Sequence, residues 1–308
     1  MGEHMRVNSS RHSLSGNTGF SRRFVSSVIA VAFVLSGGLL GFVAVRAEGF
    51  VVWTGEAGTP DWHTDTNWNP ARVPDDGHIV IIRKGSVVEC NYDTKAVMLQ
   101  CEGDLIVSGG ILNLANGSVL NGGRLTWAGG TIRGSGKLIV ATDAQFVIEM
   151  KARQAVLGMA VENRGQVLVL KGDTTVHMNK GYTQTGAGTL IYEIGSDGVS
   201  VPLVVGKHET LALGGRLHVS SVDGYLPEEG KAFKLFQYGN DVERSGVFDE
   251  VTCSEVNKRF IAQYDFVYPG VVVNVKVVPE DSTAAFWESE INLRAAAGSA
   301  KAPFPVGK

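Results

Sequence analysis

Cysteine and proline are both scarce in this chain. Its 308 residues include 3 cysteines and 9 prolines, against 39 glycines. Three is an odd number, which rules out a framework in which every cysteine is paired within the chain. Many glycines with few prolines indicate a fold with frequent tight corners rather than a disordered linker.

An excess of charge of either sign is also missing. The formal net charge is −3 and the isoelectric point is near 6.2. No basic stripe interleaved with aromatic residues is present, so we expect no nucleic-acid partner. With 44% hydrophobic residues, the chain is long and apolar enough to bury a core.

The pattern of acidic residues argues against an enzyme. Residues 103–148 contain only Asp104 and Asp143 as acids and no histidine, whereas a groove that cleaves sugars needs an acid and a base on its face. Adjacent side chains on a strand point to opposite faces, so neighbouring carboxylates do not readily share one substrate. In turn-like segments such pairs are simply solvated. The pairs here are Asp75 with Asp76, Glu228 with Glu229, and Asp249 with Glu250.

Recognisable metal and cofactor motifs are missing as well. The histidines after the N-terminal segment show no H-x-x-x-H spacing, and the cysteines show no C-x-x-C spacing. Acids of one loop could gather around a calcium ion, but no calcium-loop glycine pattern accompanies them, and we interpret them as surface acids. These acids are Asp61, Asp65, Asp75 and Asp76. The sequence therefore predicts neither a metal nor a cofactor.

What is present is a series of short strand-like pieces in residues 103–149. Apolar pieces recur every six to eight residues, and within them apolar and polar residues roughly alternate, which is the period of a half-buried strand. Glycine pairs between the pieces mark corners, because glycine adopts backbone angles that other residues rarely adopt. Such short strands bury a core only when coils stack on one another. The pieces are residues 105–107, 111–114, 119–120, 125–127, 131–132, 138–140 and 146–148.

The first 47 residues have the composition of an export signal. A basic beginning is followed by an uncharged apolar run over residues 24–45, and Val45-Arg46-Ala47 places small residues at the −3 and −1 positions of a cleavage site. We expect cleavage after Ala47. The alternative is an uncleaved membrane anchor, because about 20 apolar residues span a bilayer. With either interpretation the rest of the chain is exported.

Cys90 and Cys101 lie close together in the exported part and could form a disulfide in an oxidising space. The alternative is that they are buried free thiols, which is common for cysteine.

Trp53, Trp62 and Trp68 fall within sixteen residues. As a structural cap they would cover the first coil of a solenoid, whose core and strand edge are otherwise exposed. As a binding site, Trp62 and Trp68 would stack on sugar rings beside Asp61 and Asn67. We prefer the cap, with Trp53 and Trp68 buried and Trp62 partly exposed.

A succession of motifs runs through most of residues 50–278. Its residues are Trp53, Gly55, Asp61-Trp62, Asn67-Trp68, Val73-Pro74, Val80–Ile82, the segments 157–169 and 182–195, and the succession over residues 203–248. The order of these motifs resembles secreted bacterial β-solenoid repeat proteins of the planctomycete type, which are similar to autotransporter passenger regions and filamentous-haemagglutinin-type adhesins. The C-terminal β-barrel of an autotransporter has no counterpart here.

We therefore predict an all-β fold, a right-handed parallel β-helix with an aromatic N-terminal cap and a β-rich C-terminal region. Its expected divisions are a signal peptide (1–47), a cap with first strands (48–102), solenoid repeats (103–181), a β-rich region (182–278) and a flexible tail (279–308).

Three functions compete on this basis. The first is a non-catalytic structural or adhesive protein of the cell surface or envelope, whose partners would be extracellular glycans or envelope components. The second is a carbohydrate-binding module, and the third a polysaccharide lyase or hydrolase. The first requires no site, so we prefer it. Any contact with a membrane is expected only through an uncleaved signal.

Overall fold

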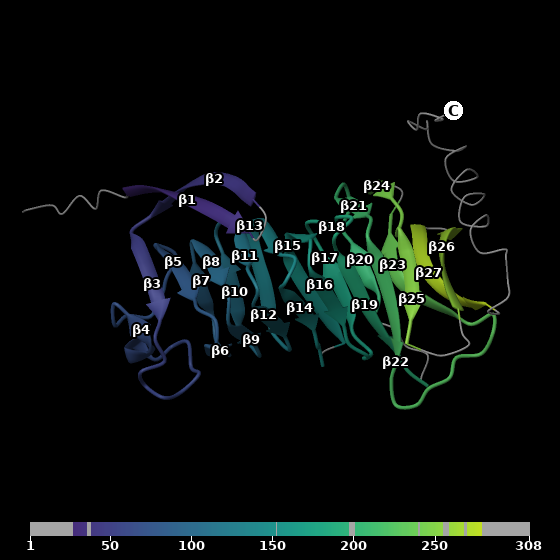
Figure 1. The fold of residues 1–308 in the computed structure, drawn as a ribbon, viewed down its shortest axis with the longest axis horizontal. Helices are drawn as coiled ribbons and strands as arrows, with labels where there is room; N and C mark the ends of the chain where they lie inside the picture. The colour runs from purple at the N-terminus through teal and green to yellow at the C-terminus, as the bar shows by residue number, and fades with distance from the viewer. Residues whose placement is uncertain are drawn as a thin grey trace, which may run out of the picture.

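The computed structural model describes residues 27–35, 38–151, 153–196, 201–239, 241–254, 259–267 and 270–278. Within these ranges the protein is all-β, with long parallel sheets, one short 3-10 helix, η1 (Asp65–Asn67), and no α-helix. Strands from successive coils stack along the long axis of the molecule (Figure 1). The predicted all-β class is confirmed, and the stacked coils are compatible with a β-solenoid.

One sheet contains eight parallel strands, and it shows the coil repeat most clearly. Val88 pairs with Leu105, 17 residues later, whereas Leu217 pairs with Val251, 34 residues later. Coils therefore lengthen toward the C-terminus while the strands stay in register. The strands are β6 (Val87–Cys90), β9 (Asp104–Val107), β12 (Arg124–Trp127), β14 (Gln145–Ile148), β16 (Gln166–Val169), β19 (Thr189–Ile194), β22 (Arg216–Ser221) and β25 (Glu250–Cys253).

The second sheet contains two parallel ladders, joined because β13 (Thr131–Val140) and β15 (Gln154–Asn163) are long enough to run through both. The first ladder consists of β3 (Gly49–Trp53), β5 (His78–Ile82), β8 (Met98–Cys101), β11 (Ser118–Leu120), β13, β15, β18 (Tyr182–Gln184), β21 (Thr210–Leu213) and β24 (Glu243–Gly246). The second consists of β7 (Thr94–Ala96), β10 (Ile111–Leu114), β13, β15, β17 (Thr175–Met178), β20 (Leu203–Val205) and β23 (Ala232–Tyr238).

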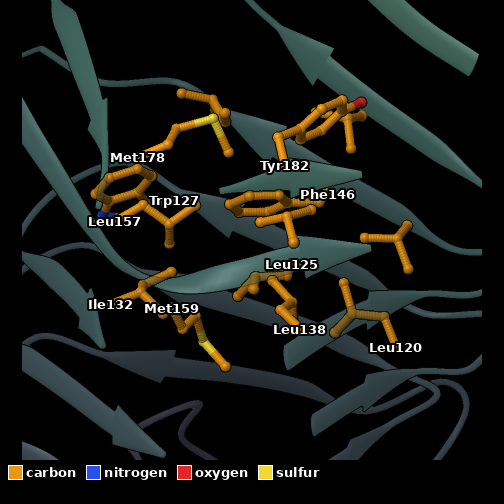
Figure 2. Close-up of a cluster of buried hydrophobic side chains, with 14 of the residues drawn as sticks. Leu120, Leu125, Trp127, Ile132, Leu138, Phe146, Leu157, Met159, Met178 and Tyr182 are labelled. Atoms are coloured by element: carbon orange, nitrogen blue, oxygen red, sulfur yellow. The ribbon is translucent and has the colours of Figure 1, made fainter. Parts of the chain in front are cut away.

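The core fills the space between the ladders with columns of apolar side chains, one residue per coil. Leu125 lies between Leu105 and Phe146 in the register, and Trp127 lies between Val107 and Ile148. All six of these side chains are at most 1% exposed. Figure 2 shows how Leu125, Trp127 and Phe146 point into the same interior as Leu138 and Tyr182. The alternation of apolar and polar residues in the sequence therefore corresponds to alternation between the core and the surface.

The glycine pairs lie at the corners, as predicted, but the two members of a pair serve different needs. Gly110 has φ +60°, which favours glycine, and a Cβ built on it would lie 2.2 Å from the carbonyl carbon of Tyr92. Gly109 has no positive φ, yet its Cβ would lie 2.7 Å from the carbonyl oxygen of Asn91. Stacked corners approach one another too closely for a side chain.

The C-terminal part of the described chain ends the stack with antiparallel strands. β27 (Gly270–Val278) pairs antiparallel with both β23 and β26 (Arg259–Val267). The direction of pairing therefore changes at this end, which stops the parallel repeat. The predicted flexible tail, residues 279–308, lies outside the described residues.

The N-terminal strands form a separate sheet. Among the described residues, β1 (Ser27–Leu35) and β2 (Gly38–Ala47) pair only with each other, antiparallel, and they run along the top of the stacked coils in Figure 1. The expected signal peptide includes both strands. Within the described ranges, no helix has the length and hydropathy needed to cross a membrane.

Candidate functional site

The three tryptophans of residues 53–68 form one compact cluster at the N-terminal end of the stacked coils. β3 supplies Trp53, the loop after it supplies Trp62, and β4 (Trp68–Asn69) supplies Trp68. The ring of Trp68 is 4.8 Å from each of the other two rings, edge to face in both cases. Its Nε1 donates a hydrogen bond of 2.7 Å to the carbonyl oxygen of Trp62. Such edge-to-face aromatic pairs add to the free energy gained by burial.

The cluster is buried completely enough to act as a cap. Trp53 is 6% exposed, Trp62 0% and Trp68 2%. The prediction that Trp62 is partly exposed is wrong. Its backbone N–H donates to the carbonyl of Glu89 in β6, and the N–H of Glu89 donates to Pro60. The loop therefore pairs with the first strand of the eight-stranded sheet, which carries Trp62 inward over the open end.

Asn67 organises the loop that holds these rings. Its side-chain Oδ1 accepts a hydrogen bond from Ala57 N–H (3.0 Å), while its Nδ2 donates to the carbonyl oxygens of Thr59 (2.9 Å) and Asp61 (3.1 Å). Its own carbonyl accepts from Thr54 N–H. Because Asn67 is fully buried and its amide is fully engaged, its role in this structure is to fix the loop.

The four residues of the predicted sugar site are therefore adjacent, but they do not form a common exposed surface. Trp62, Trp68 and Asn67 are buried, so neither indole offers a free face to a sugar ring. Only Asp61 reaches solvent, with 41% of its side chain exposed. Partial burial acts to raise the pKa of Asp61, but hydrogen bonds from the Thr64 hydroxyl and the His63 N–H, together with the His63 side chain, lower that pKa below its usual value.

An exposed aromatic patch lies beside this cap, and sequence reasoning missed it. Tyr92 is 67% exposed, and its ring meets that of His63 edge to face with 5.7 Å between centroids. His63 Nε2 is 3.3 Å from both the Asp93 carbonyl oxygen and Thr94 Oγ1, and His63 Nδ1 is 3.7 Å from Asp61 Oδ1. No local signal joins residues 61–63 to residues 92–94, because the fold alone brings the two segments together.

Cys90 and Cys101 are both buried free thiols, and the disulfide between them is absent. They belong to different sheets, Cys90 to β6 and Cys101 to β8. Cys101 donates a hydrogen bond from Sγ to the carbonyl of Gly103 (3.2 Å). Burial raises the pKa of both thiols, that of Cys101 to about 12. In this environment they remain neutral and act as small core side chains.

Three members of the adjacent acidic pairs, Asp75, Asp249 and Glu250, have local roles in turns and ladders. Asp75 Oδ1 lies 2.6 Å from His78 Nδ1 and accepts from Gly77 N–H. Asp249 accepts a hydrogen bond from Gly215 N–H (2.6 Å). Glu250 Oε2 accepts one from Nε of Arg216, which lies in the preceding coil (2.7 Å). In the part of the chain that the structure describes, His, Cys, Asp and Glu side chains form no group of three that could hold a metal ion.

Comparison with known proteins adds no relative, since the chain matches no protein family model, no curated protein sequence and no solved structure.

Proposed function

We propose that this chain is an exported, non-catalytic structural or adhesive protein of the cell surface or envelope, folded as a right-handed parallel β-helix. The observation that carries the proposal is the unbroken register of the eight-stranded sheet from β6 to β25. Every coil adds about 4.8 Å to a continuous ladder, which yields a stiff, elongated body with a repeating face.

The outward side chains of that sheet support a structural role. Gln145 donates to Gln166 in the next coil (2.9 Å), and Arg216 pairs with Glu250. Both pairs lie in one row of outward side chains, to which the first residue of each of these strands contributes. At these two places polar side chains of neighbouring coils bond to each other, an arrangement that reinforces the stacking of coils without a bound ligand.

Export and processing can be tested directly. We expect the protein to be recovered outside the cytoplasm with Glu48 as its first residue, because Val45-Arg46-Ala47 fits a cleavage site after Ala47. The measurement is fractionation of the producing cells followed by N-terminal sequencing. Substituting Ala47 by a bulky residue is the matched control and should leave the precursor uncut. Recovery of the protein in the cytoplasm would contradict the proposal.

A second candidate function, carbohydrate binding, is favoured by Tyr92 rather than by the tryptophans. The exposed Tyr92 ring stands beside His63 and the half-exposed Asp61 carboxylate, so an aromatic face and polar groups adjoin on one surface. Sugar recognition commonly combines these two elements, since the ring covers the apolar face of a sugar and polar groups bond to its hydroxyls.

A glycan array separates the two candidates. If carbohydrate binding is the function, Tyr92→Ala should abolish binding with no change in thermal stability, because the Tyr92 side chain is exposed. Phe50→Ala, which removes another exposed aromatic residue, is the matched control and should leave binding intact. Absence of binding by the parent protein would sink the carbohydrate candidate. Release of reducing or unsaturated sugars from pectin or alginate would instead indicate an enzyme.

A further inference from the structure

The outer side of the first ladder is unusually apolar over its first coils. Ile82, Cys101 and Leu120 occupy one register position and point into the core, so the residues just before them point outward. The residues one position and three positions before them therefore form two rows on the outer side of the ladder. We call their apolar residues in β5, β8, β11 and β13 the outer apolar face, which consists of Ile79, Ile81, Met98, Val119 and Ile139.

Three side chains of this face are buried although they point away from the core, and Ile81 and Ile139 are half-buried. Ile79 and Met98 are 0% exposed and Val119 is 3% exposed. Farther along the same outward row, Ile139 is followed by Glu162, Thr183 and then Ala212 and Ser245. Apart from Gln100 in β8, the row therefore has large apolar side chains up to β13 and none beyond it, which indicates that a second layer covers only the first coils.

The N-terminal hairpin is placed to be that layer. In Figure 1, β1 and β2 run along the top of the solenoid at the level of β5, β8, β11 and β13. Strands of 9 and 10 residues extend about 30 Å, which is ample to cross four coils spaced about 4.8 Å apart. Among the described residues the hairpin shares no ladder with the stacked coils and forms a two-stranded sheet of its own.

We propose that the hairpin is the layer that covers the outer apolar face, and that removal of residues 1–47 turns this face into a docking surface for a second copy of the mature chain, packed sheet on sheet about a two-fold axis. This inference rests on the processing step of the proposed function. In the precursor the hairpin would keep the face covered until cleavage.

The absence of charge on the outer apolar face suits contact with the same face of a second chain. From β3 to β11 its two outward rows contain no charged residue, so two copies meet without like charges opposed. Lys137 and Glu162, paired at 3.1 Å, mark where charge begins. Flat sheets pack face to face about 10 Å apart, and a two-fold contact covers the same surface on both chains in one step. Because the face spans few coils, we expect a weak, concentration-dependent dimer.

Analytical ultracentrifugation of two forms tests the proposal, namely the full-length precursor and the mature chain of residues 48–308. The mature chain retains the ladders from β3 to β27 and loses only Ala47 from the described core cluster. We expect the precursor to be monomeric and the mature chain to dimerise as concentration rises. Val119→Lys in the mature chain should abolish the dimer, whereas Thr183→Lys, in the same row beyond the face, should preserve it.

Three results would overturn the proposal. They are a mature chain that stays monomeric at all concentrations, a precursor that dimerises equally well, and a dimer that survives Val119→Lys. Should Val119→Lys unfold the chain by circular dichroism, Ile81→Lys on the half-buried part of the face replaces it with the same expected loss. Failure of processing is a separate result, because an intact N-terminus in cells leaves the association of the purified mature chain unaffected.

Discussion

Replacing Trp68 by alanine is expected to lower the free energy of unfolding by about 3–5 kcal/mol, the usual cost of deleting a large buried aromatic side chain. Trp68 is the central ring of the cap. Its removal leaves a cavity between Trp53 and Trp62 and deletes the hydrogen bond to the Trp62 carbonyl. The loss is measured by urea unfolding followed by far-ultraviolet circular dichroism, with the slope of the transition checked for constancy.

Tyr92→Ala is the matched control for Trp68→Ala. It removes an aromatic side chain from the same end of the solenoid, but one that is 67% exposed, so we expect a change within about 0.5 kcal/mol. Equal, small losses for both variants would mean that the tryptophans do not cap the core. The cap interpretation would then be abandoned.

Replacing Gly110 by valine is expected to destabilise the protein by more than about 3 kcal/mol, and it combines two costs. Its φ of +60° strains any residue with a Cβ, and more so a β-branched one, by about 1–3 kcal/mol. The new Cβ would also lie 2.2 Å from the backbone of Tyr92 in the preceding coil, so the stacked corners would have to separate.

Two further substitutions separate these costs. Gly58 has φ +71° with no atom near its would-be Cβ, so Gly58→Val reports backbone strain alone. Gly134 has no positive φ, but its Cβ would lie 2.0 Å from the Leu114 carbonyl oxygen, so Gly134→Ala reports the close approach alone. We expect each to cost less than Gly110→Val in thermal unfolding. If Gly110→Val melts at the same temperature as the parent protein, the corners at Gly110 and Tyr92 do not stack closely.

Strand positions in the repeat region could be predicted because each strand carries its own periodic signal. The predicted pieces 111–114, 125–127 and 146–148 coincide with β10, β12 and β14 to within a residue. The break predicted between 132 and 138 is absent, because β13 continues through it with a register shift between Arg133 and Lys137. Gly134 and Gly136 there allow close approach to the preceding coil rather than a corner.

The candidate sites were less predictable, because burial depends on partners that are distant in sequence. Trp62 precedes the polar residues His63, Thr64 and Asp65, which suggested exposure, yet pairing with Glu89 turns it inward. The spacing of Cys90 and Cys101 suggested a bridge, but the chain places them on different sheets. Tyr92 carried no signal of its own, since an exposed tyrosine gains meaning only from His63 beside it.

By itself the sequence determined the all-β class, the short strands and the glycine corners, because alternation of apolar residues and backbone freedom are local properties of the chain. The tertiary structure alone decided which tryptophans are buried, that the two thiols stay apart, and that Ile79, Met98 and Val119 are covered on the outer side. Periodicity shows which residues share a face of a strand. Only the stacking of coils decides what lies against each face.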